Sequence, residues 1–170
     1  MKKSIVAVLA LGCLPALLQG KTLKFPQKHP EFSVTFPNNW KAEITDAGII
    51  SAQPKGAAYA ISIFPVQANT ARGAIEETMK EVDKRFSDIK ANDPVEFKSG
   101  SGVTMLESDI TATDKESPRA LAIVAFSFDK ENYFALFQAG TPEADKQYTD
   151  AVVSIVNSIT SLKNQRSDDD

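Results

Sequence analysis

The chain has 170 residues, and its 19 Lys and Arg against 22 Asp and Glu make it mildly acidic. A surface of this charge gives no electrostatic footprint for nucleic acid, which we therefore exclude as a partner. Cys13 is the only cysteine and His29 the only histidine, so disulfides and most nucleophile or zinc chemistries lack the residues they need. A domain of this length can nevertheless bury a core by packing alone.

The first twenty residues have the layout of a secretory signal. Lys2 and Lys3 form a positive start, Ile5–Leu18 is a nearly unbroken apolar run, and Gln19-Gly20 supplies a polar, small-residue end. The run is about 14 residues long, which is short for a membrane span. We predict cleavage after Gly20, which removes two lysines and lowers the net charge from −3 to −5.

Two other interpretations of this segment remain open. Ala10-Leu11-Gly12-Cys13 loosely resembles a lipobox, which would lipidate Cys13 and provide membrane contact. The segment could also stay uncleaved as an anchor. Our prediction is a signal peptide over 1–20, one α/β domain over 21–162, a disordered acidic tail over 163–170, and a periplasmic or secreted location.

Alternating apolar side chains predict strands over the first third of the domain. Phe32, Val34 and Phe36 alternate with polar residues, and Pro37-Asn38-Asn39 then makes a turn. Further strands are predicted over 40–45, 49–52 and 57–66, separated by turns at 46–48 and 54–56.

The apolar period then changes to that of an amphipathic helix, with an N-cap at Thr70 and a stop at Asn92-Asp93-Pro94. Its stripe is Ile75, Met79, Val82, Phe86 and Ile89.

Four strands and a second helix are predicted for the remainder. The strands cover 95–98, 103–113, 119–128 and 133–139, and the last two form a hairpin around residues 129–132. Thr141 caps the final helix, with Pro142 at its first position. The stripe of this helix is Tyr148, Val152, Ile155, Ile159 and Leu162.

The strands over 119–128 and 133–139 are apolar on both faces, which is typical of central strands in a sheet covered on both sides. The two one-sided helices can supply the covers. We therefore expect an α+β fold in which a mainly antiparallel sheet of about six or more strands lies between helices.

The motif Phe32-Ser-Val-Thr-Phe-Pro-Asn-Asn-Trp40 and the order of elements over residues 22–162 resemble the PsbP/Mog-like fold family. That family includes extrinsic photosystem II subunits, a nuclear Ran-binding protein and bacterial envelope proteins. The resemblance implies a binding or assembly module rather than an enzyme. Metal-binding histidines of some photosynthetic members have no counterpart here except His29.

Individual residues suggest several sites, each with a simpler structural interpretation. Glu107 and Asp109 lie two apart on one strand face and could share a proton or a metal, although a solvated face is the favoured interpretation. Trp40 is expected in the core and His29 on the surface. Residues 99–102 are expected to form a flexible connection.

The functional prediction is a non-enzymatic binding or assembly module of the bacterial envelope. We expect a monomer with an envelope protein as partner, no cofactor, no metal and no catalytic residue. The binding residues are not identified; the turns 37–39, 53–57 and 99–102 are the first to test. The alternatives are an envelope hydrolase that uses Glu107 and Asp109, and a small-molecule carrier with an apolar pocket.

Overall fold

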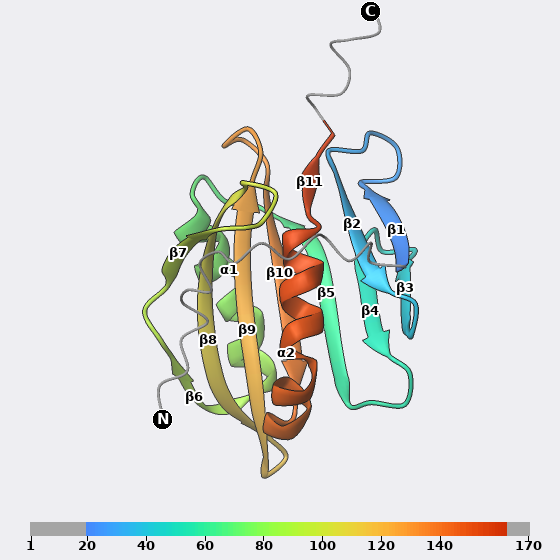
Figure 1. Cartoon of the computed structure of the whole chain (residues 1–170). Coiled ribbons are helices and arrows are strands. Elements are labelled where there is room, and N and C mark those ends of the chain that lie inside the picture. Colours follow the sequence, from blue (N-terminus) through green and yellow to red (C-terminus); the bar gives the residue numbers. More distant parts are fainter. Residues whose placement is uncertain (1–19, 163–170) are drawn as a thin grey trace, which may run out of the picture.

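The computed structural model describes residues 20–162, which form two helices and two antiparallel sheets (Figure 1). The predicted cleavage of 1–20 and the tail over 163–170 fall outside the described residues, apart from Gly20. The larger, eight-stranded sheet has the order β3-β4-β5-β10-β9-β8-β6, and β7 also pairs with β8. Its strands are β3 (Trp40–Ile44), β4 (Ile50–Pro54), β5 (Tyr59–Val66), β6 (Ser87–Ala91), β7 (Val95–Lys98), β8 (Thr104–Asp114), β9 (Ser117–Ser127) and β10 (Tyr133–Gly140).

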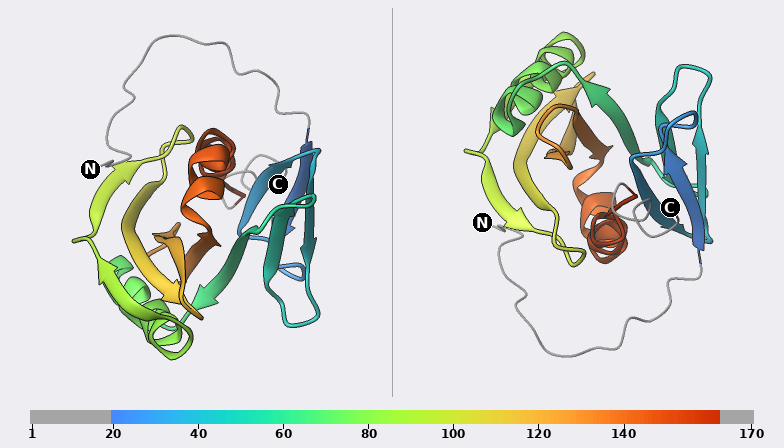
Figure 2. Two further views of the ribbon diagram at one scale, coloured as in Figure 1. Left: turned by 90° about the horizontal axis from the view of Figure 1, so that it is seen from below. Right: turned by 90° about the horizontal axis from the view of Figure 1, so that it is seen from above.

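One helix covers each face of this sheet, which confirms the predicted α+β sandwich. Helix α1 (Ala71–Arg85) packs on the outer, convex face, and α2 (Pro142–Asn157) lies in the concave face (Figure 2). The second sheet, β1 (Gly20–Phe25), β2 (Phe32–Pro37) and β11 (Thr160–Ser161), packs beside α2.

The central strands are buried on both faces, as their sequence predicts. Residues 121–126 of β9 alternate between the core under α1 and the surface that faces α2, and all six are buried. Phe32 is fully buried in the α2-side core, where its ring contacts four other phenylalanines. Burial of this much apolar surface is what stabilises a chain that has no disulfide.

Both helices are shorter than the apolar stripes predicted. Helix α1 ends at Arg85, and Phe86 has an extended backbone. Ile89 lies instead in β6, which pairs with β8 through a bulge. Likewise α2 ends at Asn157, and Ile159 and Leu162 lie beyond the helix. In each case sheet pairing overrides a helical pattern that continues past the true end.

The smaller sheet is the part of the fold that the sequence did not reveal. β1 pairs with β2 along its whole length, and β11 adds two residues to the other edge of β2. The Ser158 hydroxyl accepts from the Thr35 backbone N–H at 2.9 Å, which joins the end of α2 to β2. The Lys21 ammonium donates to the Ala42 carbonyl at 2.7 Å, so that β1 also covers part of the β3 edge of the large sheet.

Candidate functional site

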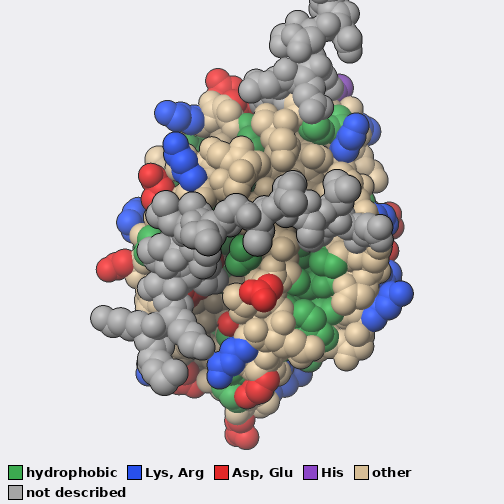
Figure 3. All heavy atoms as spheres, in the orientation of Figure 1, with side chains coloured by type: hydrophobic (Ala, Val, Ile, Leu, Met, Phe, Trp, Pro, Cys, Tyr) green, Lys and Arg blue, Asp and Glu red, His purple; other side chains and the backbone are tan. Residues whose placement is uncertain are grey.

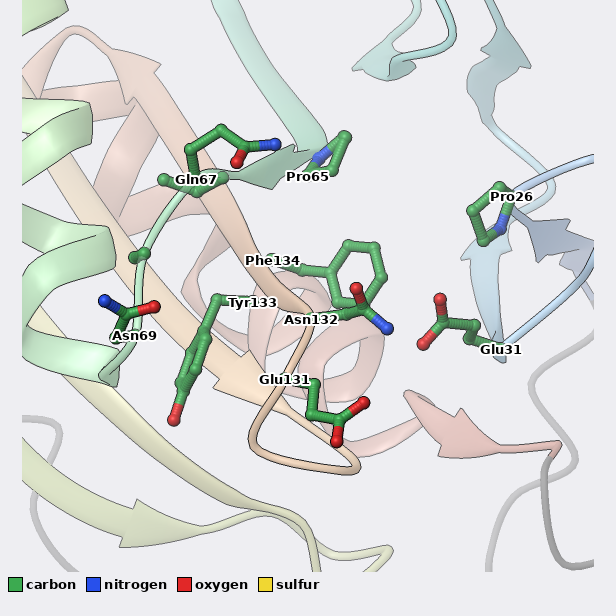
Figure 4. Close-up of a pocket in the computed structure, with 11 residues that line it drawn as sticks. Pro26, Glu31, Pro65, Gln67, Asn69, Glu131, Asn132, Tyr133 and Phe134 are labelled. Atoms are coloured by element: carbon green, nitrogen blue, oxygen red, sulfur yellow. The ribbon is translucent and has the colours of Figure 1, made fainter.

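A cavity of about 410 Å³ opens where three loops meet at one end of the sheet (Figure 4). We call it the loop-end cavity. Glu31 and Asn132 face each other across it, from the β1–β2 loop and the β9–β10 turn respectively. The full lining is Pro26, Glu31, Pro65, Val66, Gln67, Ala68, Asn69, Glu131, Asn132, Tyr133 and Phe134.

The β9–β10 turn that forms one wall is held by side-chain hydrogen bonds. The Asp129 carboxylate accepts from the backbone N–H groups of Glu131 and Asn132, both at 2.9 Å. The Ser127 hydroxyl accepts from the Lys130 N–H at 2.8 Å. Such side-chain caps fix the backbone of a short turn, so Glu131 and Asn132 are presented from a defined position.

The loop-end cavity is polar and carries no catalytic group of a familiar kind. Its titratable side chains are Glu31, Glu131 and Tyr133, and it contains neither histidine nor cysteine. Tyr133 and Phe134 are both buried, Tyr133 in the core under α1 and Phe134 in the core on the α2 side, so neither ring is an exposed stacking surface. The arrangement can accept hydrogen bonds and position a partner, but it offers no pair of nucleophile and base.

Three acidic side chains form a second feature at the opposite end of the sheet, beneath α2. We call Glu107, Asp109 and Asp145 the carboxylate cluster. Glu107 and Asp109 project from β8 on the face that carries Met105, which belongs to the core under α2. Asp145 comes from the first turn of α2, where the positive end of the helix dipole stabilises a negative charge.

Burial and mutual repulsion shift the titration of this cluster. Burial is the larger cause, and the charges of Asp109 and Asp145 add to it, raising the pKa of Glu107 to about 7. Burial followed by the Asp145 charge raises the pKa of Asp109, and burial alone raises that of Asp145. In the described part of the chain, the salt bridges are Lys41–Glu43, Lys80–Glu77, Lys84–Glu81 and Arg119–Asp114, so none neutralises this cluster.

Two buried polar atoms lie beside the carboxylate cluster without a hydrogen-bond partner, namely the Gln138 Oε1 and the Tyr59 hydroxyl. Gln138 is 5 % exposed and stands in register with Asp109 across the small Ala122 of β9. Tyr59 is 2 % exposed; burial, with a smaller contribution from the Asp145 charge, raises its pKa. An unpaired polar group of this kind is costly in a protein interior and is often part of a site.

The structure corrects the solvated-face interpretation of Glu107 and Asp109, because both side chains are half-buried and face α2. Trp40 is in the core as expected, at 5 % exposure, and its ring meets those of Tyr59 and Tyr148. His29 is exposed, also as expected.

The turn at residues 99–102 is anchored rather than a free connection. Its Gly100 N–H donates to the Asn157 side chain at 2.7 Å, and the Ser101 hydroxyl donates to the Ile159 carbonyl. The turns 37–39 and 53–57 lie together, since the Lys55 N–H donates to the Asn39 carbonyl at 3.1 Å. None of these three turns lines the loop-end cavity. The sequence analysis did not predict that cavity.

A third hollow, of about 320 Å³, lies beside α1 on the convex face. Phe64, Phe86 and Phe137 make it apolar, and Glu81 and Arg85 belong to its rim. The structure pairs Glu81 with Lys84, and Glu77 with Lys80, each at three residues' separation.

Neither the protein-family models nor the curated proteins contain a match to this sequence. Solved structures do match in fold. LpqN of Mycobacterium tuberculosis, described as involved in cell envelope biogenesis, superposes with a TM-score of 0.59 at 12% identity, over 84% of this chain and 91% of LpqN. The cyanobacterial PsbP of Synechocystis sp. PCC 6803 superposes with a TM-score of 0.58 at 7% identity, over 89% of this chain and 98% of the PsbP chain.

The Ran-binding protein Mog1p of Saccharomyces cerevisiae gives a TM-score of 0.55 at 8% identity, over 87% of this chain and 98% of Mog1p. The chain therefore has the PsbP/Mog1 fold, which confirms the resemblance inferred from residues 32–40. Across residues 20–162, no helix is long and apolar enough to cross a membrane. Within the same range, no three His, Cys, Asp or Glu side chains are arranged to hold a metal ion.

Proposed function

We propose that this chain is an exported, non-enzymatic accessory module of the bacterial cell envelope that binds a protein partner. The observation that carries the proposal is the loop-end cavity, where loops from distant parts of the chain form a polar hollow on a rigid sheet. Loops held by a rigid scaffold are the usual place for recognition. The fold relatives described as envelope or Ran-binding proteins support the same class of function.

Site-specific photo-crosslinking in cells tests this proposal. A photoreactive residue at Asn132 or Gln67 lies in the loop-end cavity, whereas one at Glu76 lies on the exposed face of α1 and serves as the control. One reproducible envelope protein crosslinked from the cavity positions, and absent from the control, is the expected result. Equal crosslinking from Glu76, or none from the cavity, would contradict the proposal.

A hydrolase remains the second candidate because one observation favours it. A pKa of about 7 would let Glu107 act as a general acid at neutral pH beside Asp109. Against this, α2 covers part of that face of the sheet, which leaves Glu107 and Asp109 half-buried. An activity screen on polysaccharide and ester substrates decides between the two functions, since turnover abolished by Glu107→Gln would favour the hydrolase.

The small-molecule carrier is tested by the same purified protein. The loop-end cavity has the size of a small ligand site, but its walls are polar and it is open. A carrier should show ligand-dependent thermal stabilisation in a metabolite screen. A flat screen together with a crosslinked protein partner would support the accessory module.

A further inference from the structure

The flank of α2 that faces β7 and β8 combines two kinds of exposed chemistry. Val95 on β7 and Val153 on α2 are the large hydrophobic side chains that stay exposed among residues 20–162, at 45% and 37%. Val95 stands in register with Glu107, so the two share one face of the sheet. Val153 precedes Asn157 by one helical turn, and Asn157 contacts Gly100 in the β7–β8 turn. Both valines therefore border the carboxylate cluster.

Acidic side chains outnumber basic ones on this flank. On the face of β8 that looks toward α2, the charged side chains are Glu107 and Asp109, and α2 contains three acidic side chains and one basic, Lys146. Asp114 lies on the opposite face of β8, with Ile110 and Ala112, and Lys90 of β6 stands in register with Thr111 on the same face as Asp109. Figure 3, which views the face where α2 lies, shows acidic side chains with a basic one among them over the lower part of this face, next to an apolar area. The salt bridges of the described chain include none of Glu107, Asp109 or the three acidic side chains of α2.

Several hydrogen-bond acceptors beneath this flank have no donor within the described chain. None of the salt bridges of the described chain includes the carboxylate cluster, and the Gln138 Oε1 and Tyr59 hydroxyl have no hydrogen-bond partner in the described structure. A group that supplies positive charge and several N–H donors matches such a set, and the ammonium of lysine or the guanidinium of arginine has both.

We infer that this flank is a docking surface for a basic segment of a protein partner. A Lys or Arg side chain of that segment lies against Glu107, Asp109 and Asp145, and aliphatic side chains lie against Val95 and Val153. The inference shares with the proposed function the view that the chain binds proteins. It does not depend on the loop-end cavity, which lies at the other end of the sheet.

Fluorescence anisotropy with the purified full chain tests the inference. The probe is a fluorescein-labelled peptide of alternating Lys and Val, and the matched probe has Glu in place of Lys. We expect the basic peptide to bind, the acidic one not to bind, and the affinity of the basic peptide to fall as salt is added. Equal binding of both peptides, or no binding of the basic one at low salt, would overturn the inference.

Isosteric variants locate the site. The double variant Glu107→Gln, Asp109→Asn keeps the shape of both side chains. It should lower the affinity for the basic peptide by about tenfold or more, the size expected for losing a charged hydrogen bond. Val95→Ser should lower the same affinity by about threefold, because apolar contact is lost. Glu76→Gln, on α1 and the opposite face, is the control and should change nothing.

The outcomes separate this inference from the proposed function. Undiminished binding by the double variant, with the fold verified by circular dichroism, refutes the docking surface and leaves crosslinking at Asn132 and Gln67 unaffected. Conversely, absence of crosslinks at those cavity positions refutes the proposed site while peptide binding at the α2 flank can persist. Measuring the affinity at several pH values adds a further check. Ionisation of Glu107 should strengthen the binding of the basic peptide as the pH rises through about 7.

Discussion

Replacing Glu107 with glutamine should stabilise the protein at neutral and alkaline pH. The glutamate has a pKa of about 7 in the folded chain, against an ordinary value of 4.5, because burial and the charges of Asp109 and Asp145 disfavour its ionised form. The folded state therefore binds the proton more tightly than the unfolded state does. Stability must fall as the pH rises from about 4.5 to about 7, the reverse of the usual carboxylate behaviour.

The size of the effect follows from the two pKa values. Each pKa unit corresponds to about 1.4 kcal/mol, so full ionisation of Glu107 costs the folded state about 3 kcal/mol. Because the side chain is only half-buried, solvent screening reduces this figure. We expect Glu107→Gln to raise the free energy of unfolding by about 1–3 kcal/mol at about pH 8, and by less than about 1 kcal/mol at about pH 5.

Urea unfolding followed by tryptophan fluorescence measures this. Trp40 is the single tryptophan, and it is buried against Tyr59 and Tyr148, so its emission reports the loss of the α2-side core. Glu76→Gln removes the same charge from an exposed position of α1 and should leave stability within about 0.5 kcal/mol of the parent. A parent protein whose stability stays flat or rises between about pH 5 and 8 would refute the reasoning. So would an equal gain for Glu107→Gln at both pH values.

Three further variants test other parts of the structure, each by urea unfolding. Gly140→Ala should destabilise by about 1–3 kcal/mol, because the new Cβ would lie 2.3 Å from the Tyr59 ring; an unchanged midpoint would show that the ring can move. Phe32→Ala should cost about 3–5 kcal/mol, since this fully buried ring joins the two sheets, and a loss below about 1 kcal/mol would contradict that role. Thr70→Ala removes the hydroxyl that accepts from the Gly73 N–H at 3.0 Å and should cost about 1 kcal/mol, unless water replaces the cap fully.

Strand and helix positions followed largely from the sequence, because local patterns encode them. The strand predicted over 95–98 matches β7, and Thr70 and Thr141 cap the two helices as expected. The two-sided apolar character of residues 121–126 identified a central strand, since only a covered sheet can bury both faces.

The errors lie where pairing with a distant segment decided the local structure. Ile89 and Ile159 continue a helical spacing, yet each lies beyond its helix end, next to residues that pair with another strand. A period of three to four residues records which side chains are apolar, but not whether a neighbouring strand offers backbone hydrogen bonds. The same limit concealed β1, whose partner β2 is needed to make it a strand.

The sequence alone determined the two-helix, antiparallel architecture, the buried Trp40, and the shared face of Glu107 and Asp109, because each depends on spacing along one segment. Only the tertiary structure brought Asp145 to those carboxylates and assembled the loop-end cavity from residues 26–31, 65–69 and 131–134. Electrostatic coupling and cavity shape depend on distances between segments far apart in the chain. Those distances are set by the packing of α2 and the small sheet against the large one, which no local pattern encodes.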